Sequence, residues 1–338
     1  MAEKGIASGG NLIVDYVKIV DSYPRQGNLS NILALDRSVG GAATNVLIDL
    51  AKIDGSIPLQ AIGLVGKDEN GDYVLSELEK NNIDTSLVSR HTSLGTSFTD
   101  VMSVNFSGER TFFHYRGANA ELGPRHFDFL KINAEILHVG YALLLDTMDL
   151  PDEEYGTVMA RVLAMAREHG IKTSMDVVSE NSDRFSRIVP PGLKYTDYCI
   201  INEVEASMIT GVPARNPDGK LNKCDIEIMC RRLFEMGVKK WAVIHAPEAG
   251  FGMDGAGKFH IQPSLDLPQG YIKGKVGAGD AFCAGMLYSA YKGWDMATAL
   301  QVAAGAAACN LSEANAVDGM KSIDEIKKLF DSMPKMKL

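Results

Sequence analysis

Short runs of β-forming residues alternate with amphipathic helical segments along most of this 338-residue chain. The alternation is typical of a mainly parallel sheet covered by helices, because each helix returns the chain to begin another parallel strand. Apolar residues at helical spacing predict helices around Val46 and Val158, and the second is expected to stop at Gly170. The expected strands are Ile6 to Val14, Leu59 to Val65, Glu135 to Val139, Ile171 to Val177, Asp197 to Ile201 and Trp241 to His245.

Two segments, at about residues 16–38 and 96–116, interrupt this alternation because they are rich in strand-forming residues and lack helices between them. In the second segment, Ser107-Gly108 stands between two such runs as a plausible hairpin turn. We expect both segments to form an antiparallel accessory sheet. No linker or repeat divides the chain, so we predict a single α/β domain over residues 1–338 with a small β lid.

The composition argues against several classes of protein. Apolar residues make up 46% of the chain and charged residues 23%, as in ordinary globular proteins. The net charge of −9 provides no overall basic field for nucleic acid. Apolar runs such as Val302 to Cys309 are far shorter than the ~20 residues of a membrane span, and the first residues do not resemble a secretory signal. We expect a cytoplasmic protein that binds neither nucleic acid nor membrane.

Cysteine and histidine spacing argues against a disulfide framework or a structural zinc site. The five cysteines are odd in number and form no C-x-x-C pair, which favours reduced thiols. The seven histidines include no H-E-x-x-H motif.

The most informative stretch runs from Gly277 to Asp280 and opens a helical pattern. Small residues at a helix start allow backbone N–H groups to converge on an anion. Asp280 is either a simple partner of the helix dipole or a base beside a bound phosphate. The second interpretation suits phosphoryl transfer, in which amides hold the transferred group and a carboxylate accepts a hydroxyl proton.

Two other glycine patterns are poor matches to nucleotide-binding motifs. Gly252 and Gly257-Lys258 have Walker A spacing, but Phe259 replaces the Ser or Thr that binds magnesium, and the segment is expected to form a hairpin. The Gly277 loop has Phe282 in place of the third glycine of G-x-G-x-x-G.

Over nearly its whole length the sequence resembles the ribokinase-like (PfkB) family of carbohydrate and nucleoside kinases. The segment from Gly40 to Val46 resembles the N-terminal glycine-pair signature, and the segment from Gly277 to Asp280 resembles the C-terminal G-A-G-D signature. The resemblance implies a Rossmann-type α/β fold and an ATP- and Mg²⁺-dependent kinase. The lid would exclude water, which otherwise competes as phosphoryl acceptor.

The resemblance also implies a role for each matching residue. Asp280 matches the catalytic base. The backbone amides that match the anion hole for the γ-phosphoryl group are those of Gly277, Ala278, Gly279 and Asp280. The residues that match the substrate site are Asp15, which binds sugar hydroxyls, and Gly40, Gly41 and Asn45, which form its floor.

Asn202 and Glu205 resemble the family's N-x-x-E magnesium motif. Carboxylate and amide oxygens there would hold Mg²⁺ through water. The alternative is a helix N-terminus with ordinary acidic residues.

Two positions depart from the family pattern. Gly274-Lys275-Val276 lacks the Asp that contributes to a monovalent-cation site in many members, so potassium activation is in doubt and Lys275 is a candidate replacement charge. Ile244 to Pro247 replaces the usual V-T-L-G turn at the nucleotide site, so contacts with the phosphoryl donor are expected to differ.

The acceptor is left open among several classes. Arg116, after aromatic residues, loosely resembles the tyrosine-arginine segment of 2-keto-3-deoxygluconate kinases and would clamp a carboxylate or phosphate; alternatively, it is a solvated lid residue. Gly117-Ala118-Asn119 instead resembles ribokinase-like and fructokinase-like members. We predict phosphorylation of a primary hydroxyl of a small sugar or sugar acid. The alternatives are a nucleoside kinase and a non-catalytic sugar or nucleotide sensor, and a homodimer through the lid is compatible with the sequence.

Overall fold

The computed structural model describes residues 3–107, 109–180 and 182–338. Its centre is a nine-stranded sheet in the order β15-β14-β13-β12-β11-β8-β1-β4-β5. The seven strands from β13 to β5 in that order are parallel, and β14 and β15 are antiparallel. The strands of this main sheet are β1 (Gly5–Gly10), β4 (Leu59–Gly66), β5 (Asp84–His91), β8 (Ala134–Ala142), β11 (Lys172–Val177), β12 (Tyr198–Asn202), β13 (Trp241–His245), β14 (Ala249–Asp254) and β15 (Phe259–Pro263). The predicted α/β class is confirmed, and the Gly252 to Lys258 segment lies in the β14–β15 hairpin.

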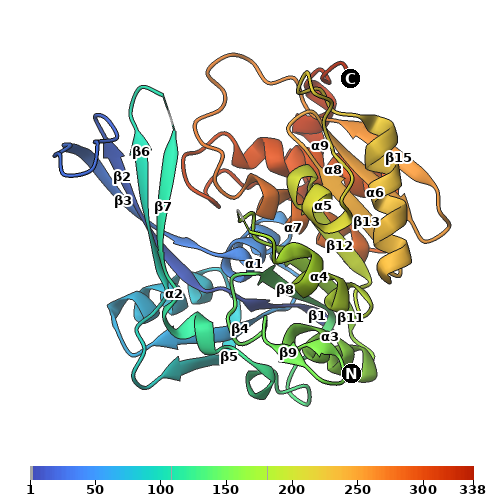
Figure 1. Cartoon of the computed structure of the whole chain (residues 1–338), viewed down its shortest axis with the longest axis horizontal. Helices are drawn as coiled ribbons and strands as arrows, with labels where there is room; N and C mark the ends of the chain where they lie inside the picture. The colour runs from blue at the N-terminus through green and yellow to red at the C-terminus, as the bar shows by residue number, and fades with distance from the viewer. Residues whose placement is uncertain (1–2, 108, 181) are drawn as a thin grey trace.

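Helices cover both faces of the main sheet (Figure 1). On one face lie α1 (Ala42–Ile53), α2 (Glu69–Lys80), α7 (Ala278–Tyr291), α8 (Met296–Asn310) and α9 (Ile323–Ser332). On the other face lie α3 (Val158–Glu168), α4 (Phe185–Leu193), α5 (Glu203–Thr210) and α6 (Lys223–Met236), with the 3-10 turns η1 (Gly117–Glu121) and η2 (Pro124–His126) and the short strands β9 (Pro151–Asp152) and β10 (Gly156–Thr157) nearby. Over the described ranges, no helix combines the length and apolar character needed to cross a bilayer.

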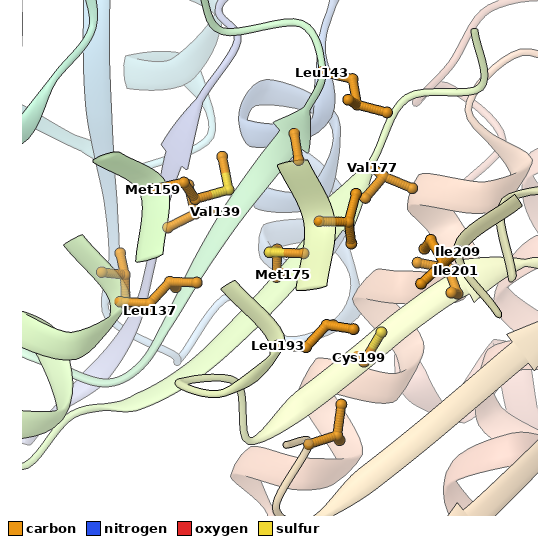
Figure 2. Close-up of a cluster of buried hydrophobic side chains, with 14 of the residues drawn as sticks. Leu137, Val139, Leu143, Met159, Met175, Val177, Leu193, Cys199, Ile201 and Ile209 are labelled. Carbon is orange, nitrogen blue, oxygen red and sulfur yellow. The ribbon is translucent and has the colours of Figure 1, made fainter. Parts of the chain in front are cut away.

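The central strands are buried on both faces, which explains their nearly continuous apolar sequences. Alternate residues of β8 point to opposite sides: Leu137 and Val139 enter the core beneath α3, α4 and α5, whereas Ile136 enters the core beneath α1 and α7. Figure 2 shows part of the first core, to which helices contribute Met159 and Leu193 and the sheet contributes residues such as Leu137 and Val139. Both cores therefore depend on the same few strands.

A separate four-stranded sheet, which we call the lid, has the order β3-β2-β6-β7 and projects beside the main sheet (Figure 1). Its strands are β2 (Ile13–Val20), β3 (Ile32–Gly40), β6 (Phe98–Val104) and β7 (Arg110–Tyr115). The pairs β2–β3 and β6–β7 are antiparallel, as expected, and parallel pairing of β2 with β6 joins the two hairpins. The turn predicted at Ser107-Gly108 includes Gly108, which lies outside the described residues.

The first predicted strand, Ile6 to Val14, is in fact two strands in different sheets. β1 ends at Gly10, whose φ of 146° favours glycine, and a Cβ there would lie 1.7 Å from the carbonyl oxygen of Gly140. β2 begins at Ile13 and belongs to the lid. The prediction joined the apolar residues on the two sides of Gly9-Gly10-Asn11 into one strand and so placed Asp15 after it, whereas Asp15 lies within β2.

Candidate active site

The N-terminus of α7 lies among the carboxyl ends of the parallel strands, where open α/β sheets generally bind ligands. Its N-cap, Gly277, has a φ of 74°, and a Cβ there would lie 2.5 Å from the carbonyl oxygen of Ala316. Glycine therefore permits the sharp turn that begins the helix. The first intrahelical hydrogen bond runs from Ala281 N to Gly277 O, at 2.8 Å. The amides of Ala278, Gly279 and Asp280 precede it and are free of intrahelical acceptors, as an anion site requires.

His245, at the end of β13, packs beside this glycine loop. A Cβ on Gly279 would lie 3.3 Å from His245 Cε1, and the imidazole ring lies 5.1 Å from the ring of Phe282. Burial lowers the pKa of His245 to about 4, so the ring is neutral near pH 7. The unusual Ile244 to Pro247 turn thus brings an uncharged aromatic ring to the predicted anion loop.

Asp280 is buried, and both of its carboxylate oxygens accept hydrogen bonds from other elements. Tyr141 Oη, at the end of β8, donates to Oδ1 at 2.6 Å. Asn45 Nδ2, in the first turn of α1, donates to Oδ2 at 2.8 Å. Burial raises the pKa of Asp280, whereas the hydrogen bonds from Tyr141 and Asn45 oppose that rise. A carboxylate held in this way can act as a proton acceptor at a defined position.

The glycine pair brings the β3–α1 turn against Asp15 and Asn11. A Cβ on Gly40 would lie 2.2 Å from Asp15 Oδ2, and a Cβ on Gly41, whose φ is 89°, would lie 2.3 Å from the backbone oxygen of Asn11. Burial raises the pKa of Asp15 to about 6, a hydrogen bond with Thr99 lowers it, and the charge of Asp280 raises it further. Asp15, Asn45 and Asp280, which come from distant parts of the sequence, are therefore brought to one region.

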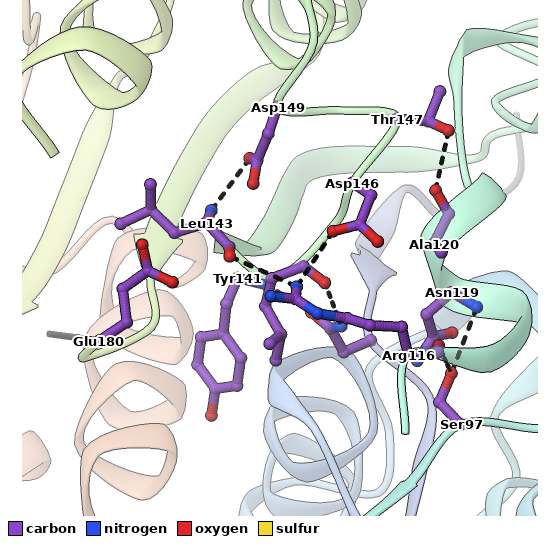
Figure 3. Close-up of polar contacts among 12 residues, drawn as sticks. Ser97, Arg116, Asn119, Ala120, Tyr141, Leu143, Asp146, Thr147, Asp149 and Glu180 are labelled. Atoms are coloured by element: carbon purple, nitrogen blue, oxygen red, sulfur yellow. Dashed lines mark hydrogen bonds and ion pairs between the residues drawn. The ribbon is translucent and has the colours of Figure 1, made fainter. Parts of the chain in front are cut away.

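Arg116, at the end of β7, makes contacts within the protein rather than only with solvent. Its Nη1 lies 3.3 Å from Asp146 Oδ1 and 3.4 Å from the carbonyl oxygen of Leu143 (Figure 3). A second arginine, Arg184, donates from Nη2 to the same Leu143 oxygen at 2.8 Å and pairs with Glu180 at 2.6 Å. Two guanidinium groups therefore meet at one carbonyl, two residues after Tyr141.

The side chain of Asn119 supports the lid by hydrogen bonding to the backbone of Leu12. Its Nδ2 donates to Leu12 O at 3.1 Å and its Oδ1 accepts from Leu12 N at 3.4 Å. The Asn119 side chain is buried, and the backbone N–H of Asn119 also donates to Ser97 Oγ (Figure 3). Asn119 thus stabilises the connection between β1 and β2.

Asn202 and Glu205 form a capping box at the start of α5. Asn202 Oδ1 accepts from the amides of Val204 and Glu205, while Glu205 Oε2 accepts from Asn202 N at 2.8 Å. Glu205 Oε1 accepts from Ser179 Oγ at 2.6 Å. Both lone pairs of Asn202 Oδ1 are engaged by the cap, so the carboxylate of Glu205 is the better donor for a cation.

Asp176, at the end of β11, adds a second buried carboxylate near Glu205. Burial and the neighbouring charges of Glu205 and Asp280 raise the pKa of Asp176 well above its usual range. Burial raises the pKa of Glu205 to about 7. Among the residues described here, no three His, Cys, Asp or Glu side chains form a ready metal site. The donors fit Mg²⁺, which commonly uses one or two carboxylates with waters and substrate phosphates.

The segment that lacks the family's aspartate lies against the loop after α8. A Cβ on Gly274 would lie 2.5 Å from the backbone oxygen of Ala314. Lys275 is exposed, whereas Lys273 Nζ lies 3.2 Å from Glu313 Oε1. The ammonium group that pairs with this loop therefore belongs to Lys273, two residues before the residue that the sequence suggested.

The sequence analysis did not identify Tyr141, Asp176 or Arg184. Tyr141 and Asp176 lie at the carboxyl ends of predicted strands, the edge where functional side chains gather in α/β proteins. Their polar side chains at these strand ends were the sequence signal by which both residues could have been found. Arg184 lies outside any such position, and its contact with the Leu143 carbonyl oxygen is what identifies it in the structure.

Comparisons with known proteins agree with this architecture. The family described as pfkB family carbohydrate kinase matches residues 4–323. The 5-dehydro-2-deoxygluconokinase of Clostridium perfringens is 24% identical over 315 residues, covering 89% of this chain and 86% of its own length. The corresponding enzyme of Geobacillus thermodenitrificans is 24% identical over 326 residues, with 89% and 87% covered.

Two solved structures share the fold. Arabidopsis thaliana ribokinase, complexed with ribose and ATP, has a TM-score of 0.80 and 20% identity, with 97% of this chain and 99% of that chain covered. The 2-dehydro-3-deoxygluconokinase of Thermotoga maritima has a TM-score of 0.78 and 18% identity over the same shares. With the family matched over nearly the whole sequence, this chain belongs to the pfkB family of carbohydrate kinases and is a sugar or sugar acid kinase.

Proposed function

We propose that this kinase transfers the γ-phosphoryl group of ATP to a primary hydroxyl of a small sugar acid. The observation that carries the proposal is the buried Asp280 carboxylate, held by Tyr141 and Asn45 beside the free amides that begin α7. Asp280 accepts the proton of the acceptor hydroxyl as that oxygen bonds to the γ-phosphorus and the bond to the ADP oxygen breaks. The amides of residues 277–280 stabilise the charge on the transferred group.

A sugar acid is favoured over a neutral sugar by the two arginines at Leu143. A guanidinium group binds a carboxylate through two parallel hydrogen bonds, and Arg116 and Arg184 both reach the segment that carries Tyr141. The relatives named 5-dehydro-2-deoxygluconokinase agree with an acidic acceptor. In the proposed site, Asp15 binds the hydroxyl groups of the acceptor, and the absence of side chains at Gly40 and Gly41 lets their turn pack against Asp15 and Asn11.

The test of catalysis is the rate of ADP release with Mg²⁺-ATP and a panel of keto-deoxy sugar acids, neutral sugars and nucleosides. Asp280→Asn is expected to lower turnover by about 10²–10⁴-fold while acceptor binding, measured by calorimetry, is retained. Asp295→Asn is the matched control, because Asp295 caps the start of α8 rather than α7. A parent protein that binds ligands without turnover would instead be a sensor, and preference for nucleosides would indicate a nucleoside kinase.

The test of acceptor class uses arginine-to-lysine substitutions, which keep the charge but remove the planar pair of donors. Arg116→Lys and Arg184→Lys are expected to raise KM for sugar acids by about tenfold and to leave KM for neutral sugars unchanged. Arg125→Lys, at an exposed arginine paired with Glu121, is the control. Equal effects on acidic and neutral acceptors would contradict the carboxylate assignment.

We further propose that Glu205 holds Mg²⁺ through water, with Asn202 positioning the carboxylate through the capping box. The ion would supply positive charge at the phosphates. Glu205→Gln is expected to raise the Mg²⁺ concentration for half-maximal activity, whereas Glu227→Gln, which affects an exposed pair on α6, is expected to have no effect. The absence of the family's aspartate from Gly274-Lys275-Val276 supports independence from potassium, for which equal rates in sodium and potassium are the test.

Self-association through the lid is a further proposal, supported by large apolar side chains on the lid that are more than half exposed. They include Leu33, Leu35, Phe112 and Phe113. Leu35→Glu is expected to shift sedimentation toward a monomer, and an unchanged oligomeric state would contradict it. A cytoplasmic location is likewise proposed, and the free state of all five cysteines agrees with a reducing compartment.

A further inference from the structure

Asp280 lies among an unusual number of acidic groups. The ionisable groups whose pKa its charge raises come from every neighbouring element and include Asp15 on β2, Asp49 on α1, Tyr141 on β8, Asp176 on β11, Glu205 on α5 and Cys283 on α7. The rings of His245, beside Gly279, and His138, beside Gly140, are both neutral near pH 7 because burial lowers each pKa to about 4. Burial disfavours the charged form of Asp280 itself, yet a proton acceptor has to be ionised.

Within the described part of the chain, the carboxylate of Asp280 accepts hydrogen bonds from two side chains, and the shorter is from Tyr141 Oη. At 2.6 Å this contact lies in the range of charge-assisted O–H···O⁻ bonds. Burial keeps the Tyr141 phenol protonated, because it raises its pKa well above the usual value. Tyr141 is therefore a permanent donor.

The backbone of Tyr141 is held by Asn11, in the connection between β1 and β2. Its N–H donates to Asn11 Oδ1 at 2.9 Å, and Asn11 N donates to Gly140 O at 3.1 Å. A hydroxyl anchored in this way defines the position of the carboxylate it binds. Since Tyr141 occupies one lone pair of Oδ1 and Asn45 one of Oδ2, each oxygen retains a lone pair for another donor.

We propose that Tyr141 is a positioning residue for the catalytic carboxylate: its hydroxyl, held at the end of β8, keeps Asp280 ionised and oriented toward the acceptor hydroxyl. The inference rests on the proposed role of Asp280 as base. The Tyr141 hydroxyl does not accept or release a proton during turnover. It stabilises the anion before the acceptor arrives, so its contribution is greatest at low pH.

The test is the pH profile of kcat for Tyr141→Phe, which removes the hydroxyl and retains the ring. The acidic limb is expected to move upward by about one pH unit, with kcat about tenfold lower below the limb and recovering toward the parent value at higher pH. Tyr288→Phe is the matched control, because Tyr288 lies on α7 and its hydroxyl bonds Asp54, away from Asp280. Its profile is expected to match that of the parent.

An unchanged acidic limb in Tyr141→Phe, or a loss of kcat equal at all pH values, overturns the proposal. If the Phe variant fails to fold, Tyr141→Met provides the same loss of donor in a flexible side chain and is expected to shift the limb in the same direction. Asp280→Asn, assayed in parallel, separates the two levels of inference. Full activity in that variant would refute Asp280 as base, whereas its inactivity with no shift in Tyr141→Phe refutes only the role of Tyr141.

Discussion

The main sheet and the lid use β-structure in opposite ways. Every residue of β1 and β4 is buried, whereas six of the nine residues of β3 are exposed. Burial on both faces stabilises the main sheet and fixes the strand ends that carry Tyr141 and Asp176. The lid exposes apolar side chains and contributes Asp15 only where it joins the main sheet. The main sheet therefore supplies stability, the lid would supply the proposed contact of Asp15 with the acceptor, and the candidate active site lies where the two sheets meet.

The largest expected difference between the two sheets is in the free energy of unfolding. Leu137→Ala, at a fully buried position of β8, is expected to destabilise the protein by about 2–5 kcal/mol. Leu35→Ala, at a position of β3 that is 73% exposed, is expected to change it by less than about 0.5 kcal/mol. Urea unfolding at low protein concentration measures both. A comparable loss in the Leu35 variant would mean that this part of the lid is covered.

The stability of the protein is expected to respond in opposite directions to the charges of two carboxylates, Asp49 on α1 and Asp21 in the lid. Asp49, on α1, is fully buried, and burial raises its pKa well above the usual range. Neither of its carboxylate oxygens has a hydrogen-bond partner among the residues that the structure describes. Such a group binds more protons in the folded state, so it lowers stability as the pH rises above about 4. Asp49→Asn is expected to raise the Tm relative to the parent, and the gain should grow between pH 5 and pH 8 by about 1.4 kcal/mol per unit of relieved pKa shift.

Asp21 in the lid provides the comparison for Asp49. Hydrogen bonds from Ser30 and Asn31 lower the pKa of Asp21 to about 2. Its charged form is therefore favoured by folding, and Asp21→Asn is expected to lower the Tm slightly at neutral pH. Thermal unfolding across pH measures both variants, and a gain for Asp21→Asn would contradict the assignment.

Where the lid meets the main sheet, a larger residue at Gly40 is expected to affect acceptor binding more than stability. Gly40→Ala would place a methyl group 2.2 Å from the present position of Asp15 Oδ2, so the carboxylate has to move. We expect KM for the acceptor to rise by about tenfold, equivalent to 1.4 kcal/mol of binding free energy, with little change in Tm. Gly55→Ala, where the new Cβ would lie 3.6 Å from the backbone oxygen of Ala51, is the control. An unchanged KM would show that Asp15 does not contact the acceptor.

The smallest expected effect is a pH dependence of acceptor binding. Because the pKa of Asp15 is raised to about 6, this carboxyl gains a proton as the pH falls through 6 and loses its capacity to accept two hydrogen bonds. The KM is expected to increase a few-fold between pH 7 and pH 5.5. Asp15→Asn should have a higher KM that is flat over this range, and a parallel slope in both proteins would assign the titration to another group.

Much of the fold was predictable because parallel strands buried on both faces leave uninterrupted apolar runs in the sequence. The break at Asn11 and Leu12 was not predictable from such a run, since it depends on the contact of Gly10 with Gly140 across the sheet. The glycine pair and the Gly277 loop were visible because close backbone approach restricts them to glycine. Their proximity to Asp15 depends on the tertiary fold and cannot be predicted from a local sequence pattern.

Less of the candidate site than of the fold could be predicted from the sequence. Tyr141 contacts Asp280 across 139 positions, and Arg184 meets Arg116 only through the carbonyl oxygen of Leu143. Asn202 was expected as a magnesium ligand from its resemblance to the family's N-x-x-E motif, and the sequence did not reveal that its side-chain oxygen caps α5. Such contacts depend on how loops of different length meet, which composition and periodicity do not encode.

The parallel pairing of β2 with β6 has a consequence for protein engineering. The lid is assembled from two hairpins that are separated in the sequence by α1, β4, α2 and β5, and each β2 residue from Val14 to Val20 is matched to a partner on β6. A chimaera that takes its lid from a relative therefore has to exchange both segments in one step. Suitable breakpoints lie before Leu12 and after Asn119, because the side chain of Asn119 is matched to the backbone of Leu12 and the two have to be inherited together.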